Sequence, residues 1–188
     1  MLDNAHVPIL GFAAWSGTGK TTLLRSLLPR LKAQGLAIAL MKHAHHTFEI
    51  DTPGKDSYEL RKAGADQVLV ASRHRWALLV ERSREHDPDL DEMLLEIDQG
   101  SLDLILVEGF KHERFPKIEV HRPALARPLL FPDDDSIIAV AADAPLGVEC
   151  SLPLLDLNDH EALTRFIVAE LPKLNPWPPR RVGSASLA

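Results

Sequence analysis

The stretch AWSGTGKTT at residues 14–22 decides the predicted fold class. It follows a short apolar segment, VPILGFA at 7–13, and leads into a segment with leucines at helical spacing, 20–34. A turn that ends in Gly-Lys-Thr between a strand and a helix is typical of a phosphate-binding loop. Ala14 stands where this pattern usually has its first glycine, and alanine fits there if that residue keeps a negative φ. The stretch therefore predicts a nucleotide site.

Each residue type in this loop has a defined role in binding a triphosphate. Backbone N–H groups curl around the β-phosphate, the Lys20 ammonium reaches the β- and γ-phosphates, and the Thr21 hydroxyl binds Mg²⁺. The helix that begins there adds the positive end of its dipole. The residues expected to hold the nucleotide are Ser16, Gly17, Thr18, Gly19, Lys20, Thr21 and Thr22.

A second requirement is an acid near the metal. The apolar segment LDLILV at 102–107 predicts a buried strand that ends at Glu108. Strand ends of this kind line the ligand crevice of a parallel sheet. We expect Glu108 to bind Mg²⁺ together with Thr21, directly or through water, or to orient the attacking water. Lys20 and Glu108 are thus the candidate catalytic residues, and the alternative for Glu108 is a structural acid that caps a turn.

The motifs alone do not separate GTP from ATP. The segment DTPG at 51–54 fits the D-x-x-G element of many GTPases, but that aspartate ends the metal-binding strand, a place taken here by Glu108. We therefore interpret the match as chance. No N-K-x-D element is present, and Asp143, after IIAVAA at 137–142, stands where such an aspartate would accept hydrogen bonds from guanine.

Two further polar segments have open roles. KHAHH at 42–46 follows a predicted buried strand at 36–41, but no fourth ligand accompanies its histidines, so contact with phosphate or a partner is favoured over a zinc site. Lys55 and Asp56 either contact the γ-phosphate or its metal, or simply belong to the turn that begins a helix, with Asp56 or Ser57 as N-cap.

Apolar strands that alternate with amphipathic helices predict an α/β fold of the P-loop NTPase type, with a mostly parallel sheet and helices on both faces. We expect one domain over 1–174, followed by a disordered tail at 175–188 that is rich in proline and small polar residues. Strands are expected at 7–13, 36–41, 67–71, 76–80, 102–107, 118–120, 137–141 and 152–155, and helices at 20–34, 56–63, 89–97 and from Asn158 or Asp159 to about 171.

Composition excludes several classes of protein. No apolar run approaches the roughly 20 residues needed to cross a bilayer, and no export signal is visible. A single cysteine, Cys150, suits a reducing cytosol, so we expect a cytoplasmic protein. The net charge of −6 argues against general nucleic-acid binding. Basic residues outnumber acidic ones between 55 and 84, which indicates either a solvated surface or a face toward a small anionic ligand.

Taken together, these segments resemble the MobB family of molybdopterin-guanine dinucleotide biosynthesis adaptor proteins. The family's own loop also has alanine at its first position, so Ala14 is ordinary for it. The resemblance covers roughly residues 8–171. The matching blocks, in the family's order, are AWSGTGKTTLL, KHAHH, DTPGKDSYELRKAGA, RWAL, LDLILVEGFKHE, IAVAAD and LLDLND.

The resemblance implies a cytoplasmic GTP-binding protein with weak GTPase activity that is usually a homodimer. Such a protein assists the MobA guanylyltransferase, which joins GMP to molybdopterin. On this sequence, residues 17–22 would hold GTP and Mg²⁺, and Glu108 would complete the metal site. Molybdopterin is a further candidate ligand, and the basic residues from Arg61 to Arg84 are compatible with its phosphate.

Two other functions remain as alternatives to an adaptor. One is a metal-insertion GTPase that uses His43, His45 and His46. The other is a phosphoryl- or nucleotidyl-transferring enzyme, suggested by the pair Glu108–Gly109. Slow hydrolysis suits the adaptor, because neither an arginine finger nor a water-positioning glutamine is identifiable from the sequence.

Overall fold

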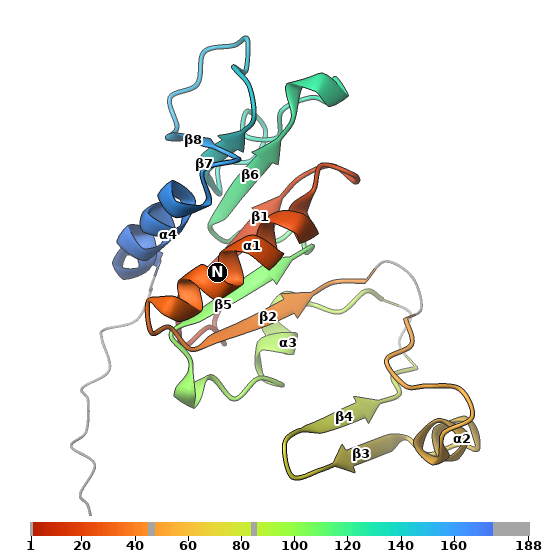
Figure 1. Cartoon of the computed structure of the whole chain (residues 1–188). Coiled ribbons are helices and arrows are strands. Elements are labelled where there is room, and N and C mark those ends of the chain that lie inside the picture. Colours follow the sequence, from red (N-terminus) through yellow and green to blue (C-terminus); the bar gives the residue numbers. More distant parts are fainter. Residues whose placement is uncertain (1, 45–47, 84–85, 175–188) are drawn as a thin grey trace, which may run out of the picture. The chain divides into compact units, whose positions relative to one another are not determined.

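The computed structural model describes residues 2–44, 48–83 and 86–174 (Figure 1). The chain divides into two compact units: the first contains the residues up to His43 and those from Asp89 onward, and the second is Ala44–Pro88. The predicted tail at 175–188 lies outside the described residues. In the described part, no helix combines the length and the apolar character needed to pass through a membrane.

The first unit is built on a six-stranded sheet in the order β2-β5-β1-β6-β7-β8. Every neighbouring pair of strands in it is parallel. This topology confirms the predicted P-loop NTPase-like α/β fold. In chain order its elements are β1 (Ile9–Ala13), α1 (Lys20–Ala33), β2 (Ile38–Lys42), α3 (Leu90–Leu94), β5 (Leu104–Glu108), β6 (Lys117–His121), β7 (Ile137–Ala142), β8 (Leu154–Asp156) and α4 (His160–Leu174), with short 3₁₀ turns at Gln99–Ser101 and Pro123–Leu125.

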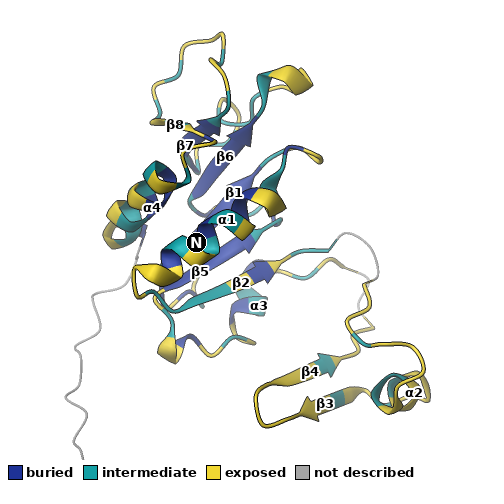
Figure 2. Cartoon of the chain, viewed as in Figure 1, coloured by how far each residue is buried: buried dark blue, intermediate teal, exposed yellow. Residues whose placement is uncertain are grey.

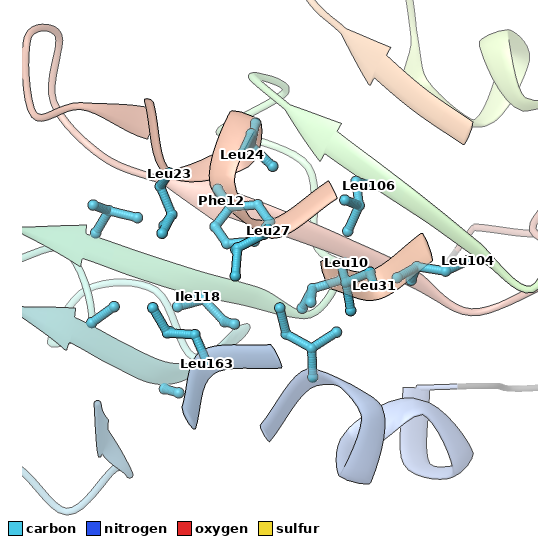
Figure 3. Close-up of a cluster of buried hydrophobic side chains, with 14 of the residues drawn as sticks. Leu10, Phe12, Leu23, Leu24, Leu27, Leu31, Leu104, Leu106, Ile118 and Leu163 are labelled. Atoms are coloured by element: carbon cyan, nitrogen blue, oxygen red, sulfur yellow. The ribbon is translucent and has the colours of Figure 1, made fainter. Parts of the chain in front are cut away.

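Helices cover both faces of this sheet, and its central strands are buried (Figure 2). On one face, Leu10 and Phe12 of β1 join a core cluster with apolar residues of α1 and α4 (Figure 3). On the other face, Ile9 of β1 and Val107 of β5 belong to a second cluster with Leu90 of α3. Successive side chains of a strand point to opposite faces, so β1 and β5 contribute to both clusters.

The carboxyl ends of three strands meet at one edge of the sheet. In the parallel register, Phe12 of β1 lies beside Glu108 of β5, and Lys42 of β2 lies beside Glu108 on the other side. Parallel α/β sheets bind their ligands at this edge. The loop from β1 to α1 begins there, so the fold places the glycine-rich segment next to the end of β5.

The second unit contains α2 (Asp56–Lys62), β3 (Gln67–Ala71) and β4 (Trp76–Val80). The two strands pair antiparallel as a hairpin, with the bounds that the sequence predicts. None of the described residues in this unit is buried, as Figure 2 shows by its exposed and intermediate colours. A unit without a buried apolar residue gains little hydrophobic stabilisation by itself.

Candidate nucleotide-binding site

The loop between β1 and α1 contains two glycines in a left-handed backbone conformation. Gly17 has φ 80° and Gly19 has φ 100°, both in the left-handed region that favours glycine. A Cβ at Gly17 would meet no atom within 4 Å, so the positive φ, and not a lack of room for a side chain, accounts for a glycine at this position. Thr18 is buried, and its backbone N–H and its hydroxyl both donate to the Trp15 carbonyl, at 3.3 and 2.6 Å.

Lys20, the first residue of α1, folds its side chain back onto this loop. Its Nζ donates to the carbonyl oxygens of Ala14 at 2.8 Å and Trp15 at 3.5 Å. Burial lowers the pKa of Lys20, while the nearby Glu108 carboxylate raises it and Lys42 lowers it further. The ammonium is thus held at the loop by carbonyl groups, within the field of one carboxylate.

The two candidate metal ligands lie together. Thr21 Oγ1 donates to Glu108 Oε1 at 3.4 Å, and the Glu108 side chain is only 13% exposed. A hydroxyl and a carboxylate are oxygen donors of the kind that Mg²⁺ prefers. Phosphate oxygens and water usually supply the rest of its coordination in phosphate-loop proteins, so this pair fits such a site without further protein ligands. Metal binding by Thr21 and Glu108 remains a prediction.

Lys42 is a site residue that the sequence did not single out by itself. It ends β2, and its Nζ lies 3.4 Å from Glu108 Oε2. The contact arises because β2 and β5 are neighbours in the sheet although they are far apart in the sequence. The ammonium balances the charge of the Glu108 carboxylate, which Mg²⁺ would share.

The turn after Glu108 is tightly packed against the end of β2. Gly109 has φ 99°, and a Cβ on it would lie 2.7 Å from His43 Cβ. The His43 N–H donates to the Glu108 carbonyl at 2.8 Å, and its ring stacks on Phe110 with centroids 4.8 Å apart. The glycine is therefore explained by the close approach of the His43 segment as well as by φ.

The described residues hold no group of three or more His, Cys, Asp and Glu side chains that could bind a metal ion. Of the three histidines in the 42–46 segment, only His43 is described, because His45 and His46 lie outside the described residues. The stacking of His43 on Phe110 gives it a packing role at the end of β2.

Residues 51–57 of the second unit show local contacts. Asp51 Oδ1 accepts from Ser57 Oγ and from the Thr52 N–H, both at 2.9 Å, whereas the buried Oδ2 has no hydrogen-bond partner among the described residues. The N-cap of α2 is Lys55, with no side-chain cap, and Asp56 is the first helical residue. The helix begins at Asp56, where the sequence predicts its start, so the expectation that Asp56 or Ser57 caps it is wrong.

Asp143 follows β7 directly and lines a pocket of about 350 Å³. The pocket lies between the segment after β7 and β8 with the residues that follow it, and its lining includes Asp156, which ends β8, and Asn158. One Asp143 oxygen pairs with an Arg122 Nη, and Arg122 Nε donates to the Thr18 carbonyl at 2.9 Å. The structure thus joins the predicted base-reading residue to the phosphate loop through a residue that the sequence analysis missed.

The loop after β6 also contacts the phosphate loop. The Trp15 indole N–H donates to the Pro128 carbonyl at 2.8 Å. The carboxylate of the buried Glu119 anchors the same loop by accepting from the N–H groups of Leu130 and Phe131, each at 2.9 Å. Burial raises the pKa of Glu119, and these two hydrogen bonds oppose the rise.

The chain was compared with known families, curated proteins and solved structures. Residues 9–143 match the family model of MobB, molybdopterin guanine dinucleotide synthesis protein B. The molybdopterin-guanine dinucleotide biosynthesis adapter protein of Escherichia coli (strain K12) is 51% identical over 176 residues, which cover 93% of this chain and 99% of that protein. This chain belongs to the MobB family.

Two other relatives agree with this membership. The protein of the same name from Haemophilus influenzae is 40% identical over 165 residues, which cover 87% of this chain and 89% of that protein. The crystal structure of Bacillus subtilis MobB has a TM-score of 0.68 at 25% identity and covers 87% of this chain and 98% of that chain. The similarity thus extends over both units of the chain.

The part that matches the MobB model contains the phosphate loop, Glu108 and Asp143. The structure places Lys20, Thr21 and Glu108 together at the ends of β1 and β5. Asp143 lies farther along the same sheet edge, after β7. The sequence carries one signal that could have indicated Arg122 as a site residue: it directly follows a strand. Glu108 is predicted from a similar position, at the end of a strand. That signal becomes specific only when β6 is known to lie between β1 and β7.

Proposed function

We propose that this chain binds GTP with Mg²⁺ and acts as an adaptor for a MobA-type guanylyltransferase that converts molybdopterin to molybdopterin guanine dinucleotide. The observation that supports it most is the contact of Thr21 with Glu108 beside a glycine loop with two positive φ angles. Membership of the MobB family supplies the pathway. The protein would act in the cytoplasm.

The triphosphate is bound mainly by charge and by backbone donors. Backbone N–H groups of the glycine loop and the N-terminus of α1 would face the phosphates, and Lys20 supplies a full positive charge. Mg²⁺, held by Thr21 and Glu108, would neutralise charge on the β- and γ-phosphates. Lys42 and Mg²⁺ share one carboxylate, so metal binding would weaken the Lys42–Glu108 ion pair.

The pocket at Asp143 favours guanine over adenine. Guanine presents N1–H and N2–H donors, which a carboxylate accepts, whereas adenine presents an acceptor at N1, which the Asp143 carboxylate would repel. The pocket volume of about 350 Å³ is in the range of small-ligand sites. We therefore assign the base to the segments after β7 and β8, and the phosphates to the loop after β1.

Hydrolysis by the chain alone is expected to be slow. Fast phosphate-loop GTPases use an arginine that contacts the transferred phosphoryl group. Arg122 is the arginine next to the loop here, and it is bonded to the Thr18 carbonyl and to Asp143. Weak activity is what an adaptor needs, because the chemistry belongs to the partner enzyme.

The second unit is the candidate homodimer surface. Alternating residues place Leu69, Trp76, Leu78 and Val80 on one face of the β3–β4 hairpin, where the register pairs Leu69 with Leu78. All four side chains are exposed, with Trp76 at 70%. A contiguous exposed apolar face marks an interaction surface, and the lack of buried side chains in this unit favours a second copy as its permanent partner.

The basic residues of this unit are candidates for the pterin phosphate. Arg61 and Lys62 are paired with Glu49, and Arg61 also with Glu81, so their charge is partly balanced within the unit. Arg73 and Arg75 are exposed in the turn between β3 and β4. We assign molybdopterin or its dinucleotide to this basic turn in the complex with the guanylyltransferase.

A pull-down with the purified MobA-type enzyme tests the adaptor function. The two proteins are mixed with GTP and Mg²⁺, with ATP and Mg²⁺, or without nucleotide, and bound enzyme is quantified. We expect GTP to increase the amount retained. Formation of the dinucleotide from molybdopterin and GTP by this chain alone would contradict the adaptor function and favour a transferase, and retention unaffected by nucleotide would contradict the role of GTP.

A further inference from the structure

Arg122 occupies the position between the two halves of the proposed GTP site. It directly follows β6, which lies between β1 and β7 in the sheet. The loop after β1 carries the proposed phosphate site, and the segment after β7 begins with Asp143. The Arg122 guanidinium bonds both of them: Nε donates to the Thr18 carbonyl at 2.9 Å, and an Nη pairs with Asp143 Oδ2.

The bond to Thr18 fixes a donor of the phosphate loop. The Thr18 carbonyl and the Gly19 N–H belong to one planar trans peptide, so the two groups point in opposite directions. Gly19 has φ 100°, a conformation open to rotation because glycine has no Cβ. When Arg122 holds the carbonyl, it also sets the direction of the Gly19 N–H, one of the donors that encircle the phosphates.

The bond to Asp143 fixes the base-reading group. Guanine recognition requires this carboxylate to be held in one orientation, and a planar guanidinium can hold it there. The Arg122 Nη atom pairs with Asp143 Oδ2. Because the guanidinium is a rigid planar fork, movement of Asp143 and movement of the Thr18 peptide are mechanically linked through a single side chain.

We propose that Arg122 is a positioning residue that couples recognition of the base to binding of the phosphates. This inference relies on the proposed binding of GTP. With guanine on Asp143, the fork is held and the Gly19 N–H stays directed at the phosphates. A base that does not engage Asp143 leaves the fork less constrained, so the loop binds its phosphates less well. Selectivity for GTP is thereby expressed at the loop as well as in the base pocket.

The test measures dissociation constants for GTP and ATP with Mg²⁺ by calorimetry, together with thermal unfolding. Arg122→Ala should lower the ratio of GTP to ATP affinity about tenfold, the range of a hydrogen bond to a charged group. Arg122→Lys keeps the charge but not the planar fork, so it should restore thermal stability more fully than selectivity. If Arg122→Ala fails to fold, the nucleotide selectivity of Arg122→Lys provides the test.

The matched control is Arg114→Ala. Arg114 pairs with Asp135 at 2.5 Å in an exposed ion pair, and both residues lie at the amino ends of β6 and β7, away from the loop edge. This variant should keep the wild-type selectivity. In an Asp143→Ala background, which has lost base recognition, Arg122→Ala should lower GTP and ATP affinity equally.

The outcomes separate the inference from the proposed function. Wild-type chain that binds no GTP, or binds GTP and ATP alike, would overturn both. If the wild type selects GTP but Arg122→Ala keeps that selectivity, with only a lower unfolding temperature or an equal loss for both nucleotides, Arg122 is merely structural and the coupling is refuted while the function stands.

Discussion

At the scale of single residues, Glu119 shows how burial sets the chemistry of a side chain outside the nucleotide site. Its carboxylate is almost fully buried and accepts two backbone N–H groups of the loop that also contacts Trp15. Burial raises its pKa above the ordinary value of 4.5. The folded state therefore holds the Glu119 proton more tightly than the unfolded state does. The contribution of Glu119 to stability falls as pH rises from the ordinary pKa through the raised pKa.

The variant Glu119→Gln tests the direction of this pH dependence of stability. Because glutamine does not titrate, the advantage of the wild type over this variant in free energy of unfolding should shrink as pH rises above 4.5 and through the raised pKa of Glu119. Two other ionisable groups act on Glu119, His121 at 3.8 Å and Asp134, and the pKa of Asp134 is lowered, so it stays ionised in this range. Urea unfolding across these pH values measures the difference. A difference that grows with pH would contradict a raised pKa.

At the scale of elements, the predicted segments correspond closely to the observed ones, because each was marked by apolar runs and by turn residues. The hairpin strands have the expected bounds, and Asp159, one of the two predicted caps, accepts from the Ala162 N–H at 2.9 Å at the start of α4. The predicted helix at 89–97 is shorter, Leu90–Leu94. Its end could not be predicted, since apolar spacing continues to Ile97 while the chain already turns toward β5.

The site could be predicted only in the parts that are contiguous in sequence. The loop of residues 14–22 and the strand end at Glu108 carry local signals. Lys42 and Arg122 carry only the weak signal that they end or follow a strand, because their roles arise from which strands become neighbours in the sheet. Strand order depends on long-range packing, which a single sequence does not display.

Gly109→Ala tests the crossing of the turn after β5 with the end of β2. The new Cβ would lie 2.7 Å from His43 Cβ at φ 99°, so we expect a loss of about 2 kcal/mol or more in free energy of unfolding, from strain and overlap together. Gly147→Ala is the control, since Gly147 has φ 73° but no atom within 4 Å of its Cβ position. It should lose only about 1 kcal/mol. Equal losses in urea unfolding would contradict the overlap.

At the scale of the whole molecule, we expected one domain over 1–174, and the described residues form two compact units. The alternation of strands and helices predicts the large sheet but does not show that the hairpin forms a unit of its own. The apolar residues of β3 and β4 predicted a pair of strands, and large ones among them, such as Leu69 and Trp76, are exposed in the single chain. A hydrophobic pattern indicates that one face of a strand packs against another surface. It does not show whether that surface belongs to the same chain or to a second one.

Leu69→Asp tests the proposed homodimer. Leu69 lies on the exposed hairpin face and is 64% exposed, so an aspartate there should cost the single chain little but should introduce unpaired charge into a dimer interface. Size-exclusion chromatography with light scattering should show a dimer for the wild type and a monomer for this variant. Leu95→Asp, in the first unit and also 64% exposed, should remain dimeric. A wild-type monomer, or a variant dimer, would contradict the assignment.

The most direct measurement of the central claim is a calorimetric titration of GTP with Mg²⁺ into the wild type and into Lys20→Ala. Lys20 is the only full positive charge within the 14–22 loop. Its removal should weaken GTP binding by about 2 kcal/mol or more while circular dichroism stays native. Equal affinities in the two folded proteins, or no binding to the wild type, would show that the loop after β1 is not where the triphosphate binds.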